Sequence, residues 1–127
     1  MAIVTVDPGD KIPAAERPSN QLAEFLAQEE VGKLVAGFPN VKVVRQRFTD
    51  IDWGSQRFDM LFVDGNHSLP AVLEDSRLAL ELVTEPGVVI WHDCNNVADV
   101  NKALEMLNVS EPIISLHNTW IAYHDTH

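Results

Sequence analysis

The chain has 127 residues, enough for one domain with its own hydrophobic core and too few for two ordinary ones. Its 46% hydrophobic content argues against disorder, and its net charge of −10 argues against non-specific binding to nucleic acid or anionic membranes. The single cysteine, Cys94, excludes an intrachain disulfide and a zinc site built from cysteines. No apolar run is long enough to span a membrane and no signal-peptide pattern is present, so we expect a cytoplasmic protein.

The first part of the chain predicts two strands around a helix. The β-branched run Ile3–Val6 predicts a strand, which the turn residues at 7–10 end. Apolar residues between Leu22 and Phe38 have helical spacing, with a break near Gly32. The run Val41–Val44 predicts the second strand.

The second part predicts further strands that alternate with amphipathic helices. The nearly continuous apolar run at 58–63 is typical of a strand buried on both faces. The predicted elements are a strand and turn at 57–65, a helix at 69–83, a strand at 88–91, a helix at 97–107 and an antiparallel hairpin formed by 113–116 and 119–123.

This order predicts one α/β domain over residues 1–127, with a mostly parallel, Rossmann-like sheet that ends in an antiparallel hairpin. In such sheets, ligands bind beyond the carboxyl ends of the strands. The polar residues expected there are Asp7, Asp10, Thr49, Asp50, Asp64, Asn66, His67, His92, Asp93 and Asn95.

Two aspartates stand out in this set. Asp64 and Asp93 follow two strands that are expected to be adjacent and parallel, which separates their backbones by about 5 Å. Such a pair can hold one hard divalent cation or take part in acid–base chemistry. Asp64-Gly65 is also a common turn dipeptide, and His92 has the alternative role of a hydrogen-bonded, half-buried histidine.

For several other polar and aromatic residues, a purely structural role competes with a role in the site. Asn95 and Asn96 are possible ligands, although we expect one of them to cap the helix that begins near Val97. Trp53 is either a packing residue or part of a lid. Trp120 and Tyr123 alternate with apolar residues and are predicted to lie in the core.

Asp7 and Asp50 follow the two strands of the first part. A carboxylate after the first strand can accept hydrogen bonds from both ribose hydroxyls of a bound nucleotide, whereas the alternative for Asp7 is a turn before Pro8. Asp50 could contact an adenine amine or lie in an ordinary surface loop.

Together, these segments resemble the class I S-adenosylmethionine-dependent methyltransferases, and most closely methyltransferase family 24 in the O-methyltransferase branch. The resemblance is carried by RFDMLFVDGNH at 57–67, PGVVIWHD at 86–93, IVTVDP at 3–8 and FTD at 48–50. It implies that Asp7, Asp50 and Asp64 border S-adenosylmethionine, with Asp7 at the ribose and Asp50 at the adenine. It also implies that Asp64 and Asp93 bind Mg²⁺ or another divalent cation.

The same resemblance implies the chemistry of the site. His67 or His92 would act as the general base, and the metal would bind and orient a hydroxyl of a small molecule for attack on the cofactor methyl group. Catechol-type relatives often have asparagine after the second aspartate, where this chain has Cys94. His67 or Asn95 could fill that place.

The resemblance begins at the family's second strand. No G-x-G occurs among the six glycines, and Ile3 already matches the second strand, so the domain is expected to be N-terminally truncated and to lack the central glycine-rich strand. An open central edge would favour association, so we expect a homodimer.

Two other functions compete with catalysis by a methyltransferase. One is a non-catalytic methyltransferase-like module that binds a ligand or a partner chain. The other rests on Gly65-Asn66-His67, which resembles the G-N-H element of calcineurin-like metallophosphoesterases; that family also needs an earlier Asp-x-His, which this chain lacks before Gly65.

Overall fold

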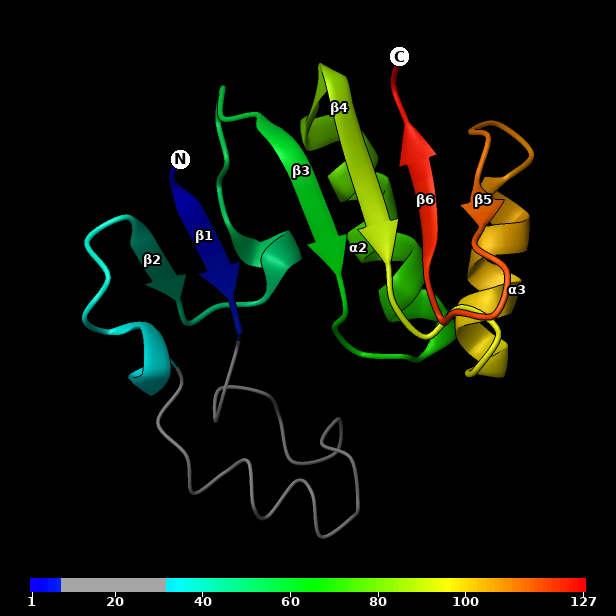
Figure 1. Ribbon diagram of the computed structural model, residues 1–127, viewed down its shortest axis with the longest axis horizontal. Coiled ribbons are helices and arrows are strands. Elements are labelled where there is room, and N and C mark those ends of the chain that lie inside the picture. Colours follow the sequence, from blue (N-terminus) through cyan, green and yellow to red (C-terminus); the bar gives the residue numbers. More distant parts are fainter. Residues whose placement is uncertain (8–31) are drawn as a thin grey trace, which may run out of the picture. The chain divides into compact units, whose positions relative to one another are not determined.

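The computed structural model describes residues 1–7 and 32–127 (Figure 1). These residues form two compact units, Met1–Asp52 and Trp53–His127. The part of the predicted first helix that precedes residue 32 lies outside the described residues.

The first unit contains a parallel pair of strands, β1 (Ile3–Val6) and β2 (Val41–Val44), as predicted. Gly32 begins the described part after residue 7, with a left-handed φ of 81°, and a Cβ there would lie 2.6 Å from a Val43 methyl group. Beyond Gly32 the predicted helix is replaced by a single 3-10 turn, η3 (Lys33–Val35). Leu34 is 92% exposed, so the apolar spacing there does not reflect burial.

The second unit contains a four-stranded sheet in the order β3-β4-β6-β5. Its strands are β3 (Phe58–Val63), β4 (Val83–Trp91), β5 (Ile114–Ser115) and β6 (Ala122–Asp125). β3 and β4 are parallel, whereas β6 is antiparallel to both β4 and β5. The α/β class is confirmed. The described strands lie in two sheets, one in each unit, with equal numbers of parallel and antiparallel pairings, so the mostly parallel, Rossmann-like sheet stays a prediction.

The C-terminal hairpin differs from the prediction at its tip. β6 begins at Ala122, so Trp120 falls in the connection between the strands and is 54% exposed. The turn is closed by the Leu116 N–H, which donates to the Ile121 carbonyl oxygen at 2.9 Å. The prediction that Trp120 lies in the core is therefore wrong, and Tyr123 is only half-buried.

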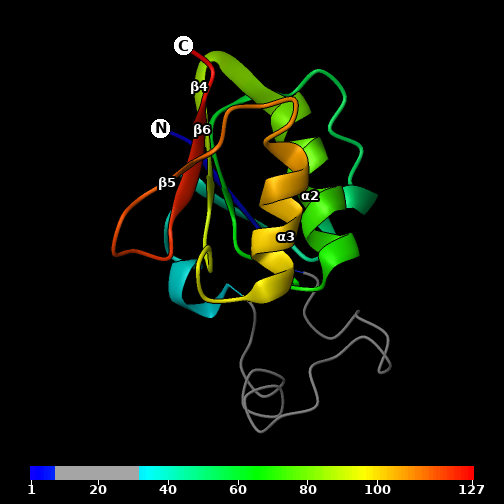
Figure 2. The ribbon, with the colours of Figure 1, turned by 90° about the vertical axis from the view of Figure 1, so that its right-hand side faces the viewer.

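Two helices, α2 (Leu69–Leu82) and α3 (Ala98–Leu107), cover one face of this sheet (Figure 2). Their apolar stripes supply most of the buried side chains, as the periodicity predicted. The buried hydrophobic residues on the helices are Val72, Leu73, Ala79, Leu82, Val100, Ala103, Leu104 and Leu107. Val89 and Trp91 of β4 are also buried. This core fixes the end of β4, from which the candidate site begins.

Trp53 is a packing residue. Its side chain is 8% exposed and contacts Phe58 edge-to-face, with ring centroids 5.3 Å apart. Among the described residues, no helix has the length and apolar character needed to cross a membrane.

Candidate functional site

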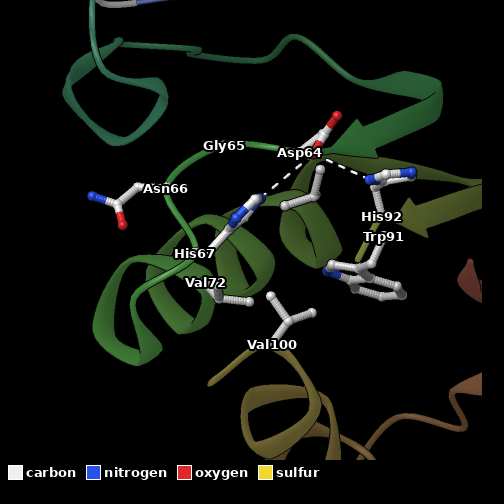
Figure 3. A pocket seen from close by; sticks show the side chains of 9 residues that line it. Asp64, Gly65, Asn66, His67, Val72, Trp91, His92 and Val100 are labelled. Atoms are coloured by element: carbon white, nitrogen blue, oxygen red, sulfur yellow. Dashed lines mark ion pairs between the residues drawn. The ribbon is translucent and has the colours of Figure 1, made fainter. Parts of the chain in front are cut away.

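The carboxyl ends of β3 and β4 bring Asp64 and His92 together. The two strands are in register up to Val63 and Trp91, and the His92 N–H donates to the Val63 carbonyl oxygen at 3.1 Å. Asp64 and His92 therefore leave the sheet side by side, as expected for neighbouring parallel strands. Figure 3 shows both side chains at the rim of a small pocket.

A tight loop after β3 returns His67 to Asp64. Within it, the Asn66 side-chain oxygen accepts a hydrogen bond from the Ser68 N–H at 2.8 Å. Asp99 of α3 then accepts a hydrogen bond from the Leu69 N–H at 3.1 Å, at the start of α2. The loop thereby places the imidazole of His67 on the same side as Asp64 (Figure 3).

The turn after β4 orients Asp93. Asp93 and Asn95 both have left-handed backbone angles, with φ of 59° and 66°. The Asn96 side-chain amide donates to Asp93 Oδ1 at 2.7 Å, which leaves Oδ2 to face the histidines. The Cys94 N–H donates to the Trp120 carbonyl oxygen at 3.0 Å and so attaches this turn to the hairpin.

The asparagines of this turn do not cap α3. The N-cap residue is Val97, and it makes no capping side-chain hydrogen bond. The amide of Asn95 instead donates to the Ser115 hydroxyl oxygen at 2.9 Å, while that of Asn96 is held by Asp93. The capping prediction is wrong because Val97 occupies the N-cap position and both asparagine amides have other partners.

Four predicted site residues meet at this edge. His67 Nε2 lies 3.0 Å from Asp93 Oδ2 and 3.7 Å from Asp64 Oδ1. His92 Nδ1 lies 3.1 Å and 3.6 Å from the same two oxygens. Each imidazole nitrogen is thus close to both carboxylates. We name Asp64, His67, His92 and Asp93 the Asp–His cluster.

Burial and charge distinguish the two carboxylates. The side chain of Asp64 is 43% exposed, whereas that of Asp93 is 10% exposed. The hydrogen bond from Asn96 lowers the pKa of Asp93, and the rings of His92 and His67 lower it further against the opposing effect of burial. Asp93 is therefore held as a carboxylate.

Three residues of the cluster offer ligand atoms for a divalent cation. Among the described residues, Asp64, His67 and Asp93 offer ligand atoms that all lie within 4.8 Å of one another. His92 Nδ1 is buried and makes no hydrogen bond of normal geometry within the described part of the chain, although an oxygen lies 3.1 Å away. A buried nitrogen that faces two carboxylates without such a bond is suited to a metal ion. The adjoining pocket offers about 10 Å³, the room of roughly one water molecule.

Aromatic side chains border His92. Its ring lies 6.3 Å from that of Phe62 and 6.1 Å, edge-to-face, from that of Trp120. Trp120 was missed as a site residue because its alternation with apolar residues predicted a core position. Asn96 was predicted as a possible ligand or cap, and the structure gives it a different role, as the hydrogen-bond donor that holds Asp93.

Asp7 and Asp50 belong to the first unit. Asp7 directly follows β1, where its N–H donates to the Val44 carbonyl oxygen at 3.0 Å. Asp50 ends the 3-10 turn η4 (Phe48–Asp50), which follows β2 along the chain. The structure therefore brings together Asp64, His67, His92 and Asp93, and it leaves the role of Asp7 and Asp50 at a nucleotide as a prediction.

Comparisons with known proteins identify the class. Residues 1–94 match the model of methyltransferase family 24, described as a methyltransferase domain. The chain belongs to this family of class I S-adenosylmethionine-dependent methyltransferases. No curated protein sequence matches the chain. Because residues 1–94 match a methyltransferase family, this membership argues against the metallophosphoesterase alternative.

A solved structure supports the same fold. The O-methyltransferase NovP is 14% identical in sequence to this chain and superposes with a TM-score of 0.70. The match covers 98% of this chain and 59% of the NovP chain, so this chain spans about three-fifths of that protein's length.

Proposed function

We propose that this domain takes part in S-adenosylmethionine-dependent O-methyl transfer to a small hydroxylated molecule, with the help of a divalent cation. The observation that carries this proposal is the convergence of two carboxylates and two imidazoles at the carboxyl ends of β3 and β4. The family supports the use of S-adenosylmethionine, and a neighbour named as an O-methyltransferase supports a hydroxyl as the acceptor.

The roles follow from chemistry and position. Asp64 and Asp93 would hold the cation, which when bound would lower the pKa of a substrate hydroxyl. His67 or His92 would accept the hydroxyl proton, because both imidazoles lie at the cluster. Asp7 would bind the ribose hydroxyls of the cofactor, Asp50 would contact the adenine, and Asp64 would border the cofactor as well as the cation.

A non-catalytic ligand-binding or partner-binding module is the second candidate. It is favoured by Cys94, which follows the second aspartate where catechol-type relatives often have asparagine. In either case we propose a cytoplasmic protein. Its net charge of −10 argues against action on nucleic acid or anionic membranes.

We also propose that the domain forms a homodimer. β3 pairs only with β4 within the described part of the second unit, and its exposed side chains include Met60 and Phe62. Edge strands that lack protecting charges or prolines favour pairing with another chain. The apolar sequence of β3 has one charged residue, Asp59.

Calorimetric titration with S-adenosylmethionine and S-adenosylhomocysteine, with and without Mg²⁺, tests the function. We expect micromolar binding that Asp7→Ala weakens by about tenfold or more, because a ribose would lose a charged hydrogen-bond acceptor. Asp125→Asn is the control, since Asp125 ends β6 at the opposite end of the sheet. An absence of heat from folded protein in all conditions would support the non-catalytic alternative.

A further inference from the structure

The sheet of the second unit carries a continuous row of apolar side chains. Phe62 of β3 lies opposite Ile90 of β4, and Ile90 lies opposite Tyr123 of β6. On the other side of β6, Tyr123 lies opposite Ile114 of β5. Residues that lie opposite one another on paired strands point to the same face of a sheet. The row therefore crosses all four strands, and we name these four residues the apolar row.

The apolar row lies on the face away from the helices. Trp91, which follows Ile90 in β4, is buried and donates a hydrogen bond to Ser76 of α2. Successive side chains of a strand point to opposite faces, so Ile90 points away from that helix. Both helices of the second unit lie on one side of the sheet (Figure 2). Phe62 and Ile114, at the two ends of the row, are exposed.

Neighbouring side chains enlarge this apolar surface. Met60 of β3 is exposed and lies opposite the half-buried Val88. Leu116, two residues after Ile114, is also exposed. The apolar row itself contains no charged side chain, and Asp125, opposite Val88, belongs to the next row. Contiguous exposed apolar surfaces of this kind mark interaction sites.

We propose that the apolar row is the interface of a homodimer in which the sheets of two copies pack face to face. The proposal rests on the homodimer of the proposed function and assigns its contact to a face of the sheet rather than to the edge of β3. In β-sandwiches, two sheets pack about 10 Å apart with interdigitated apolar side chains. A two-fold axis through the middle of the face sets the row of one copy against that of the other, as an isologous interface requires.

The charge and size of the surface favour a second copy as its occupant. The chain carries a net charge of −10, so two copies repel each other unless the surface between them is uncharged, as the apolar row is. Four strands about 4.8 Å apart and three rows about 6.7 Å apart, those of Met60, Phe62 and Leu116, span roughly 19 by 20 Å. Two copies therefore bury on the order of 1,000 Å², which is at the low end for specific interfaces. The dimer is accordingly weak and dissociates on dilution.

Packing through the face and pairing through the edge differ in what they do to β5. The strand order β3-β4-β6-β5 puts β5 at the edge opposite β3. Pairing between two β3 edges would leave Ile114 and Leu116 exposed, whereas face-to-face packing buries them together with Phe62. Substitutions on the β5 side of the sheet therefore distinguish the two modes of association.

The double variant Ile114→Gln, Leu116→Gln of the full chain tests the proposal. Sedimentation equilibrium over a range of micromolar concentrations measures the dissociation constant of the dimer. We expect the variant to raise this constant by about tenfold or more, because two side chains that become buried lose their apolar groups. The matched control is Met106→Gln, Val109→Gln, which makes the same change at two exposed positions outside the sheet and should leave the constant unchanged.

Tyr123 reports on the face directly. It is the only tyrosine of the chain, it is half-buried in a single copy, and it lies in the middle of the apolar row. Nitration of its ring, followed by mass spectrometry, should slow several-fold as the wild type is concentrated through its dissociation constant. The same concentrations should not slow the reaction in Ile114→Gln, Leu116→Gln.

Circular dichroism must show that each variant is folded. A dimer that persists in Ile114→Gln, Leu116→Gln and leaves Tyr123 equally reactive would overturn packing through the face, while the proposed homodimer would stand with another interface. A wild type that is monomeric at every concentration would overturn both. The separate S-adenosylmethionine titration would still report on the proposed catalytic function.

Discussion

The indole of Trp91 donates a hydrogen bond to the hydroxyl oxygen of Ser76 at 2.8 Å, and both side chains are buried. Trp91 is the last residue of β4 and Ser76 lies in the middle of α2. This bond joins the helix to the strand end immediately before His92. It therefore helps to fix the position from which half of the Asp–His cluster extends.

Ser76→Ala should destabilise the second unit by about 1–3 kcal/mol, because the buried Trp91 N–H loses its partner. Urea denaturation followed by tryptophan fluorescence measures the free energy of unfolding. Ser55→Ala is the control, since Ser55 is exposed and its replacement should change stability by less than about 0.5 kcal/mol. Equal stabilities of the two variants would show that the Trp91–Ser76 bond contributes little.

Much of this fold could be predicted because burial imposes a period on the sequence. The continuous apolar run at 58–63 and the helical spacing after Leu69 and Ala98 gave the elements that form the core. The apolar spacing failed around Leu34, where Gly32 adopts a left-handed angle and the chain makes only a short 3-10 turn. The backbone conformation around Gly32 therefore overrides the helical spacing of the apolar residues there.

The candidate site was predictable to the extent that it follows strand ends. Asp64 and His92 come directly after paired residues of β3 and β4, so sheet topology alone brings them together. The hydrogen bond from Asn96 to Asp93 accompanies left-handed angles at Asp93 and Asn95, which these residue types adopt more often than others but which the sequence does not specify. The contact of Trp120 with His92 depends on where a hairpin turns, which apolar alternation does not specify.

Asp93 should make the stability of the metal-free protein depend on acidity. Its pKa is lowered from the usual 3.8 in the folded state, first by the hydrogen bond from Asn96 and then by the two histidines. The ionised group therefore contributes stability that is complete above the usual pKa and is lost as the pH falls through the lowered one. In Asp93→Asn, the loss of stability between about pH 5 and about pH 2 should be smaller than in the wild type.

Urea denaturation at a series of pH values, after removal of metal by a chelator, measures this slope. Asp125→Asn is an informative comparison, because the pKa of Asp125 is also lowered, mainly by its hydrogen bond with His127. That pair is exposed to solvent and screened, so its removal should alter the slope less. Parallel profiles for the wild type and Asp93→Asn would contradict the lowered pKa of Asp93 in the folded protein.

Two exposed apolar side chains of β3 give the test of the homodimer. Met60 is 60% exposed and Phe62 is 54% exposed, and their spacing of two residues places both on one face of the strand. Burial of such side chains contributes roughly 1.5–3 kcal/mol each when complete. The double variant Met60→Gln, Phe62→Gln removes this apolar surface without changing the charge, so it should be monomeric where the wild type is dimeric.

Light scattering coupled to size-exclusion chromatography, over a range of micromolar concentrations, measures the mass of each protein. Val109→Gln is the matched control, because Val109 is 89% exposed and lies outside β3. It should remain dimeric, since general surface hydrophobicity is not the cause of association. A wild type that is monomeric throughout would refute the dimer, and a double variant that still dimerises would move the interface away from β3.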